Sequence, residues 1–568
     1  MFEKIYSSAE DLIDWDWSRY QPYFNDLAGQ SLSDTNVEAW LADWTRVINC
    51  LDEQYSRLYL ATAKNTADTA AQQRFNRFID DVYPQAEAVS QTLKQKLLAS
   101  ALQPAGFEIP LRNLRAEADL FRSENLPLLV EEVKLSTQYD QIVGAQTVEW
   151  EGQELTPSQL QPIYQDPERD VREKAWRTAF DRQLADRGAI NELWQQLLAV
   201  RLKIAHNAGR PDYRTYQWQE MLRFDYTPAD CHSFHDAIER VVVPAALRVY
   251  ERRRHRLGLS SLRPWDMDVD PLNRPPLRPF KDAVELKTRV SAMFHKLDAQ
   301  LGAYFDTMVS ENLLDLDNRK NKAPGGFCTS FAVVHRPFIF MNAVGLQDNV
   351  MTLLHESGHA FHVFESANLP FAQQHFVPSE FAEVASMSME LLAAPYLAAG
   401  QGGFYSPADA RRAMVEQLEG MITFWPYMAV VDAFQHWVYE NPQKACDTGQ
   451  CDATWSKLWD RFMPGVDWSG LEDAKVTGWQ RKLHIFTNPF YYVEYGLAYL
   501  GAAQVWRNSL DNQAAAVASY RQALALGGTQ PLPQLYQAAG ARLAFDTEIL
   551  YDVITLIEDF LDKDLSEK

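Results

Sequence analysis

Val350-Met-Thr-Leu-Leu-His-Glu-Ser-Gly-His-Ala-Phe-His-Val-Phe364 is the segment from which the rest of the sequence can be interpreted. At about 100° per residue, its mainly apolar positions fall on one face of a helix, and His355 and His359 fall on the opposite face. The positions on the packed face are Val350, Leu353, Leu354, Ser357, Phe361 and Phe364. We therefore expect a helix with one side buried in the core and the other side free for chemistry.

The two histidines are four residues apart, so they stack one helical turn above each other and both can reach one cation. Neutral imidazole suits zinc. Glu356 is rotated away from both rings, which keeps it off the metal but close enough to take a proton from an activated water. The motif predicts His355 and His359 as zinc ligands and Glu356 as the general base. The simpler alternative is a histidine pair on a solvated helix face.

A catalytic zinc needs a third protein ligand and an open position for water. His362 lies two helical turns from His355, so a straight helix cannot bring both rings to one ion. In the next predicted helix Glu380, Glu383 and Glu390 form one stripe. We take Glu383, in the middle, as the third ligand and expect Glu390 to hydrogen-bond a ligand histidine. Spacing alone also allows Glu380, and a solvated stripe would need no metal.

Two short strands are expected before the zinc helix. Residues 323–326, Ala-Pro-Gly-Gly, form a turn, residues 327–334 are β-prone, and residues 338–341 make a second strand. An extended peptide can add to the edge of such a sheet, beside the metal. We expect Gly326, in the turn, to contact substrate. A hairpin that only packs against the helix is the alternative.

Composition narrows the class of protein. The chain has 568 residues, 46% of them hydrophobic, which is enough for an extensive core. Its formal charge of -22 argues against general binding to nucleic acid or to anionic membranes. We find no secretion signal and no run that approaches a membrane span. Five scattered cysteines fit a reducing compartment, so we expect a soluble cytoplasmic protein.

Three regions are predicted along the chain. Residues 1–130 form an N-terminal helical region, residues 131–280 a helical lobe and its connection, and residues 281–568 the catalytic zinc-binding lobe. Five prolines between Arg263 and Phe280 mark the connection. Cys231 and His235, four residues apart, could hold a second metal, but no third ligand lies near them in the sequence.

Several motifs carry a family resemblance. With His-Glu-Ser-Gly-His-Ala-Phe-His at 355–362, Phe-Ala-Glu-Val-Ala-Ser at 381–386, and Met389-Glu390, the chain resembles the oligoendopeptidase F and thimet oligopeptidase family of zinc metallopeptidases. It is most similar to the oligoendopeptidase F branch. The likeness spans roughly residues 145 to 550 through the stretches 171–176, 262–266, 337–345, 484–495 and 526–531.

The resemblance implies a mainly α fold, a two-lobed helical ellipsoid with a deep central channel and a small β-sheet beside the zinc helix. One Zn²⁺ per chain would be held by His355, His359 and Glu383, with Glu356 as the general base. The implied activity is hydrolysis of internal bonds in short unstructured peptides. The resemblance leaves the oligomeric state open.

The family also places histidine and tyrosine donors opposite the metal. Here the matching segment is residues 484–495, and we assign catalytic roles to His484, Tyr491 and Tyr492 and a substrate contact to Tyr495. The spacing leaves open which phenol faces the substrate and stabilises the oxyanion, and we assign that role to Tyr491, with Tyr492 and Tyr495 behind it. Two other functions compete: a peptide-binding or chaperone-like protein with a structural zinc, which requires four protein ligands, and a zinc hydrolase acting on non-peptide amides.

Overall fold

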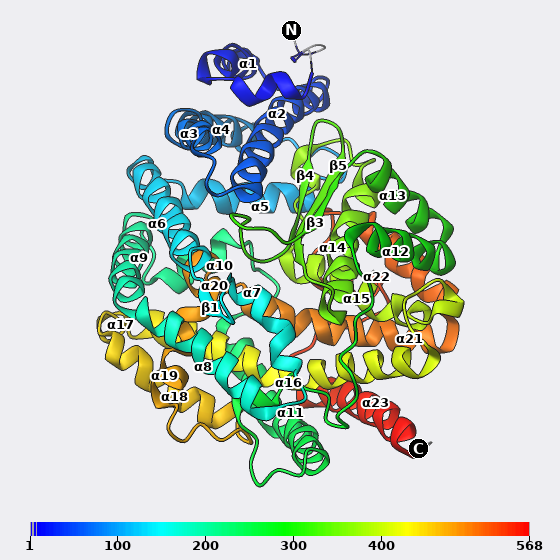
Figure 1. The fold of residues 1–568 in the computed structure, drawn as a ribbon. Coiled ribbons are helices and arrows are strands. Elements are labelled where there is room, and N and C mark those ends of the chain that lie inside the picture. Colours follow the sequence, from blue (N-terminus) through cyan, green and yellow to red (C-terminus); the bar gives the residue numbers. More distant parts are fainter. Residues whose placement is uncertain (1, 3–4, 7, 567–568) are drawn as a thin grey trace.

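Helices dominate the computed structural model, which describes residues 2, 5–6 and 8–566 (Figure 1). The predicted mainly α fold is therefore confirmed. The first helices are α1 Trp17–Gly29, α2 Val37–Lys64, α3 Thr69–Arg77, α4 Tyr83–Ala99, α5 Glu108–Leu120 and α6 Leu126–Gly144. A small hairpin and a second group of helices follow: β1 Val148–Trp150, β2 Gln153–Leu155, α7 Pro157–Leu160, α8 Arg169–Ala185, α9 Arg187–Asn207, α10 Tyr213–Glu220 and α11 Pro228–Arg256.

The remaining elements include the predicted zinc helix and the helices that follow it. Before and at the motif lie α12 Ala283–Leu297, α13 Ala299–Ser310, β3 Leu314–Asp317, β4 Phe327–Phe331, β5 Arg336–Ala343, α14 Gln347–Ser366 and α15 Ser379–Ala393. The chain ends with α16 Pro407–Glu440, α17 Pro442–Ala445, α18 Thr448–Phe462, α19 Glu472–Val476, α20 Leu483–Thr487, α21 Tyr492–Leu524, α22 Leu532–Ala538 and α23 Thr547–Ser566.

Two hydrophobic cores organise these helices. The smaller core draws on residues between Phe2 and Leu114, with Phe371 as its one buried member from later in the chain. It lies within the group of N-terminal helices at one end of the molecule in Figure 1. The larger core includes buried residues from Leu60 to Leu561 and contains α14 and α15. The region boundaries at residues 130 and 280 stay predictions.

The sheet beside α14 has three strands in the order β3-β5-β4. β4 pairs antiparallel with β5 and forms one edge, as the two predicted strands require. β3 pairs with β5 in parallel and was not expected from the sequence. The predicted hairpin edge therefore exists. At the start of β4, the ring of Tyr59 from α2 packs against Phe327 at a tilt, with the ring centroids 5.5 Å apart.

α15 is buried on nearly all sides between α14 and α21. Tyr520 of α21 donates a 2.8 Å hydrogen bond from its hydroxyl to the carbonyl oxygen of Ala385. A helix buried on all sides cannot carry a solvated stripe, so its glutamates must find partners inside the protein.

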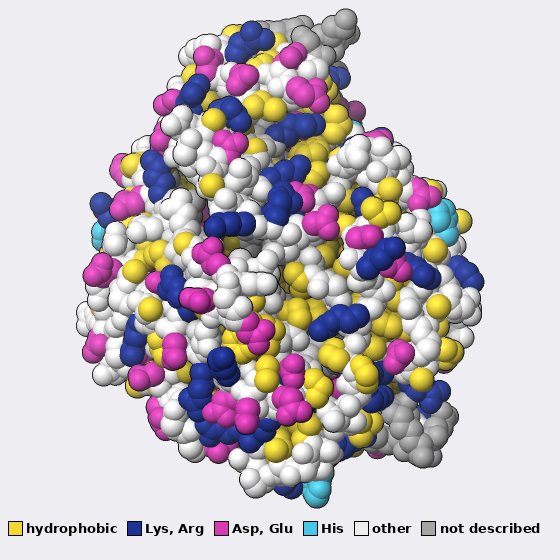
Figure 2. All heavy atoms as spheres, in the orientation of Figure 1, with side chains coloured by type: hydrophobic (Ala, Val, Ile, Leu, Met, Phe, Trp, Pro, Cys, Tyr) yellow, Lys and Arg dark blue, Asp and Glu magenta, His cyan; other side chains and the backbone are white. Residues whose placement is uncertain are grey.

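Lys and Arg side chains are interspersed with Asp and Glu on the face shown in Figure 2. A surface that binds nucleic acid usually gathers its positive charge into a patch or stripe, which this face does not display. In the described part of the chain, no helix has the length and apolar character needed to cross a membrane.

Candidate metal centre

α14 presents the motif as predicted. Leu353 and Phe361, on the packed face, are fully buried. The helix begins at Gln347, directly after a bend at residues 344–346. The Asn349 side chain closes this bend, because its Oδ1 accepts hydrogen bonds from the N–H groups of Val344 (2.8 Å) and Leu346 (3.0 Å). This closure fixes where the helix starts and therefore which face the histidines occupy.

Gly358 allows α14 and α15 to approach closely. A Cβ atom at this position would lie 2.5 Å from the carbonyl oxygen of Ala385 and 2.6 Å from Cα of Ser386, both backbone atoms. Any side chain here would force the two helices apart. The glycine inside the motif therefore sets the distance between the histidines of α14 and the glutamates of α15.

His355, His359 and Glu383 come together between the two helices. Oε2 of Glu383 lies 3.3 Å from Nε2 of His355 and 3.6 Å from Nε2 of His359. Candidate ligand atoms of the three residues all lie within 4.8 Å of one another. Ligand atoms around one tetrahedral zinc are separated by about 3.4 Å, given metal–ligand bonds of about 2.0–2.2 Å. Two imidazoles and a carboxylate at these separations fit one zinc ion.

Hydrogen bonds from outside hold two of these side chains. Nδ1 of His355 lies 2.8 Å from Oε1 of Glu390, so Nδ1 donates a hydrogen bond to this carboxylate and Nε2 is the nitrogen that can bind a metal. Glu390 also accepts a 3.3 Å bond from Nε2 of Gln417. The Tyr491 hydroxyl donates a 2.5 Å bond to Oε1 of Glu383. The structure thus places Glu390 where the sequence put it, whereas Gln417, on α16, carried no local signal.

The protonation of His359 and Glu383 suits metal binding. Burial lowers the pKa of His359 to about 4, so its ring is neutral at pH 7. Burial opposes ionisation of Glu383, but His359 and His355 lower its pKa to about 2. A neutral imidazole and a carboxylate are the forms that zinc binds. Burial opposes protonation of His355, but Glu383 and Glu390 raise the pKa of this ring well above its usual value, so zinc would displace a proton from Nε2.

Glu356 points into the same space without joining the three. Its side chain is 5% exposed, and Oε2 has no hydrogen-bond partner in the described part of the chain. Burial raises the pKa of Glu356 to about 7. A buried carboxylate oxygen without a partner costs stability, so such a group is more typical of a reaction site than of a structural contact.

Glu380, the alternative ligand left open by spacing, is occupied elsewhere. Tyr226 donates a 2.5 Å hydrogen bond from its hydroxyl to Oε1 of Glu380, and Nε of Arg223 lies 3.2 Å from the same oxygen. The Arg223 guanidinium also donates a 2.7 Å bond to Glu494. Glu380 therefore belongs to a buried ion-pair network and is not a member of the group formed by His355, His359 and Glu383.

The segment 484–495 lies across from Glu383. Nε2 of His484 is 3.2 Å from the Tyr495 hydroxyl oxygen, and the His484 ring centroid lies 5.8 Å from that of Tyr491. Burial lowers the pKa of His484 to about 3, so the ring is neutral. The structure therefore brings His484, Tyr491 and Tyr495 together around the predicted ligands.

Tyr492 occupies a different place from its neighbours. It is 4% exposed, and its ring packs against Phe424 and Tyr427, with centroid distances of 5.5 and 5.8 Å. Its hydroxyl makes no hydrogen bond with the three predicted ligands. Tyr492 supports the wall of the site, while Tyr491 and Tyr495 face into it.

Gly326 lies immediately before β4 and beside α14. A Cβ atom there would lie 3.3 Å from Cγ2 of Thr352, a tight contact. Two residues later, burial and the nearby carboxylate of Glu356 raise the pKa of the Cys328 thiol well above its usual value. The start of β4 therefore runs past the base, where a substrate contact was expected.

A second cluster joins the predicted pair Cys231 and His235. The expectation that no third ligand lies near was wrong, because the folded chain brings Asp432 and His436 of α16 close to the pair. Candidate ligand atoms of Cys231, Asp432 and His436 lie within 4.8 Å of one another. However, Nη1 of Arg214 lies 3.3 Å from Nδ1 of His436. A guanidinium only donates, so Nδ1 accepts and the proton of the ring sits on Nε2, which has no lone pair left for a metal.

Comparisons with known proteins identify the family of this chain. The model of peptidase family M3 matches residues 163–553. An oligoendopeptidase F homologue of Borreliella burgdorferi is 23% identical over 235 residues, a match that spans 40% of this chain and 38% of that protein. A crystal structure assigned as an oligoendopeptidase F superposes with a TM-score of 0.91 at 26% identity, covering 96% of this chain and 97% of the other.

PZ peptidase A, solved with an inhibitor, superposes with a TM-score of 0.90 at 27% identity and covers 98% of this chain and 97% of its own. The similarity thus extends over nearly the whole chain, including the N-terminal helices outside the matched family region. The matched family region contains all the predicted ligands and the segment opposite them. This chain is therefore a member of peptidase family M3, within which its fold matches the oligoendopeptidase F structures.

Proposed function

We propose that this protein is a zinc-dependent endopeptidase that hydrolyses internal bonds of short unstructured peptides. One observation carries the proposal: His355, His359 and Glu383 converge at zinc-binding separations, with the unpartnered carboxylate of Glu356 beside them. Zinc bound there would polarise the scissile carbonyl and lower the pKa of a water molecule toward about 7. No fourth protein ligand joins the group among the described residues, so a position stays open for reaction.

Glu356 then performs the proton transfers. Its raised pKa, near 7, lets it accept a proton from the attacking water and later release that proton to the leaving amine. A carboxylate of ordinary pKa would be a weaker base at the first step and would not hold the proton for the second. His355 is kept in its metal-binding orientation by Glu390 throughout.

The oxyanion of the tetrahedral intermediate needs hydrogen-bond donors. Tyr491, assigned this role from the sequence, donates its only hydroxyl proton to Glu383, so we give it the role of positioning that ligand. Tyr495 is better placed to donate. If His484 donates from Nε2 to the Tyr495 oxygen, the phenolic proton remains free for the oxyanion.

The substrate would bind along β4. This strand is an edge of the sheet and lies next to α14, and a peptide that adds to it would pair through its backbone with little regard for its side chains. Only an extended segment can do this, which favours unstructured peptides over folded proteins. Gly326 would let the peptide backbone approach the start of the strand closely.

Cleavage of an internally quenched peptide tests the proposal. The purified protein should cut it at an internal bond, a chelator should stop the reaction, and added zinc should restore it. A protein that binds the peptide without cutting it, and that holds zinc through four ligands, would instead be a binding protein with a structural metal.

A further inference from the structure

Lys482 is a cation without a counter-charge near the candidate site. Its Nζ atom lies 3.9 Å from the ring centroid of Tyr492 and 5.5 Å from that of Tyr427. Among the described residues, no carboxylate lies within ion-pair distance of Nζ, and no acceptor forms a hydrogen bond with it. The side chain is only half-exposed, and burial lowers the pKa of Lys482 to about 7.

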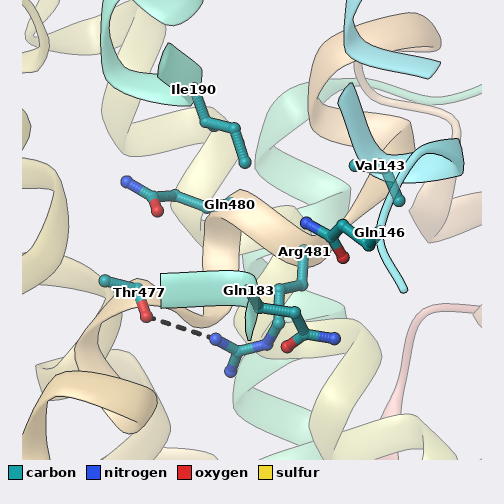
Figure 3. A pocket seen from close by; sticks show the side chains of 7 residues that line it. All are labelled: Val143, Gln146, Gln183, Ile190, Thr477, Gln480 and Arg481. Carbon is teal, nitrogen blue, oxygen red and sulfur yellow. Dashed lines mark hydrogen bonds between the residues drawn. The ribbon is translucent and has the colours of Figure 1, made fainter. Parts of the chain in front are cut away.

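The preceding residue shows how a basic side chain is satisfied here. Arg481 lines a small cavity of about 60 Å³ (Figure 3). Its guanidinium donates to Oγ1 of Thr477 at 3.2 Å and to the carbonyl oxygen of Ala474 at 2.7 Å. Arg481 therefore has protein partners, whereas among the described residues the amine of Lys482 contacts only aromatic faces. A partly buried ammonium without an acceptor is unfavourable, and burial lowers the pKa of Lys482, so folding alone gives no reason for it.

Lys482 also lies next to residues that face the metal ligands. The Tyr492 ring beneath its ammonium group is 5.2 Å from the His484 ring, centroid to centroid. His484 in turn contacts the Tyr495 hydroxyl. Lys482 is thus connected through the rings of Tyr492 and His484 to the Tyr495 hydroxyl, the donor that we place opposite the scissile bond.

We propose that Lys482 binds the C-terminal carboxylate of the peptide substrate. This inference rests on the proposed peptidase function. A carboxylate is the acceptor that the ammonium lacks, and every unmodified peptide brings one at its end. The substrate would then run, from N- to C-terminus, from the metal past His484 to Lys482. At about 3.3 Å per extended residue, only a few residues would follow the cleaved bond.

One peptide made in two forms tests the inference. The form with a free C-terminal carboxylate should have a kcat/KM about tenfold to a hundredfold above that of the C-terminal amide in the wild-type protein. In Lys482→Met the ratio of the two values should fall to about one, and in Lys482→Arg most of the preference should remain. Because the ratio is taken within one variant, a partial loss of folded protein cancels.

Lys174→Met is the matched control, since its ammonium also lies over an aromatic ring, 5.0 Å from the centroid of Trp150. It should keep the wild-type preference. An amidated peptide with Glu as its last residue distinguishes the source of the carboxylate: slow cleavage supports the terminal carboxylate, and fast cleavage that depends on Lys482 would overturn that assignment in favour of a side chain.

Failure of the role of Lys482 and failure of the peptidase function give different results. If the wild type cleaves both forms equally well, or if Lys482→Met keeps the preference, Lys482 does not bind the C-terminus although the protein remains a peptidase. If the wild type cleaves neither form in the presence of zinc, the proposed function itself fails.

Discussion

Two clusters in this protein use the same kinds of side chain, yet only one is arranged for a metal. His355 and His359 meet Glu383 between α14 and α15, and His235 and His436 meet a carboxylate between α11 and α16. His355 and His359 share α14 and are partly exposed, whereas His235 and His436 come from two helices and are buried. Residue type therefore does not decide which cluster binds zinc.

The hydrogen bonds on the outer side of each ring make the difference. At His355, Nδ1 donates a hydrogen bond to Glu390, so Nε2 is the nitrogen that faces the cluster and can bind a metal. At His436, Arg214 donates to Nδ1, so the proton of the ring is on Nε2, and the Nε2 atom lies 3.3 Å from Oδ2 of Asp432. His235 adds a second contact at 2.8 Å to the same carboxylate oxygen. One cluster offers ring nitrogens to a cation, and the other surrounds its carboxylate with protons.

The largest expected contrast comes from removing each carboxylate charge. Glu383→Gln should lose its bound zinc at equimolar metal and with it all measurable peptidase activity, because a ligand is lost. Asp432→Asn should keep zinc and activity and lose only stability, by about 1–3 kcal/mol, because its hydrogen bonds weaken. Metal analysis, peptide cleavage and urea unfolding of both variants check this. Loss of zinc in Asp432→Asn would refute the distinction.

Removing the base should separate catalysis from metal binding. Glu356→Gln preserves the shape of the side chain but cannot accept a proton, so kcat should fall by about 10² to 10⁴. Zinc content should stay at the wild-type level because Glu356 is not a ligand. Single-turnover cleavage and metal analysis are the measurements, and activity close to wild type would remove Glu356 from the role of base.

The tyrosines should differ in what they lose. Tyr495→Phe should lower kcat by about 10² to 10³ with little change in KM, as expected for an oxyanion donor. Tyr491→Phe should have a smaller effect on kcat and should weaken zinc binding, because it releases Glu383. If Tyr491→Phe lowers kcat more while zinc affinity is unchanged, Tyr491 is the oxyanion donor and the assignment from the sequence alone holds.

The smallest effect is expected one step further from the metal. Glu390→Gln leaves a hydrogen bond to His355 but removes its charge, so zinc affinity should fall about tenfold to a hundredfold. Competition with a zinc-binding dye measures this. Gln417→Leu, which removes only the 3.3 Å contact to Glu390, is the matched control and should lower affinity less. An unchanged affinity in Glu390→Gln would mean that the bond to His355 does not tune the metal.

The sequence predicted the parts of this site that depend on local geometry. Helical spacing alone predicted His355, His359 and Glu356, and the stripe on the following helix offered Glu383 and Glu390 but left Glu380 open as a ligand. The two strands before α14 were also predicted, because their turn and β-prone residues are contiguous. These features need only the period of a helix or strand and a short connection between neighbours.

Features set by distant packing could not be predicted in this way. Gln417 reaches Glu390 from α16, and Arg214 reaches His436 across more than two hundred residues. β3 is short and pairs in parallel with β5, so the sequence contains no hairpin turn that would predict it. Nothing in the spacing of Lys482 shows that it lacks a counter-charge. These properties follow from which surfaces meet in the folded chain, and only the structure supplies that information.

Anomalous X-ray diffraction at the zinc absorption edge, on crystals of the zinc-loaded protein, tests the central claim most directly. We predict one peak per chain, bounded by Nε2 of His355, Nε2 of His359 and a carboxylate oxygen of Glu383, with no fourth protein ligand. A peak beside Asp432, an empty site between α14 and α15, or a fourth side chain on the metal would contradict the account.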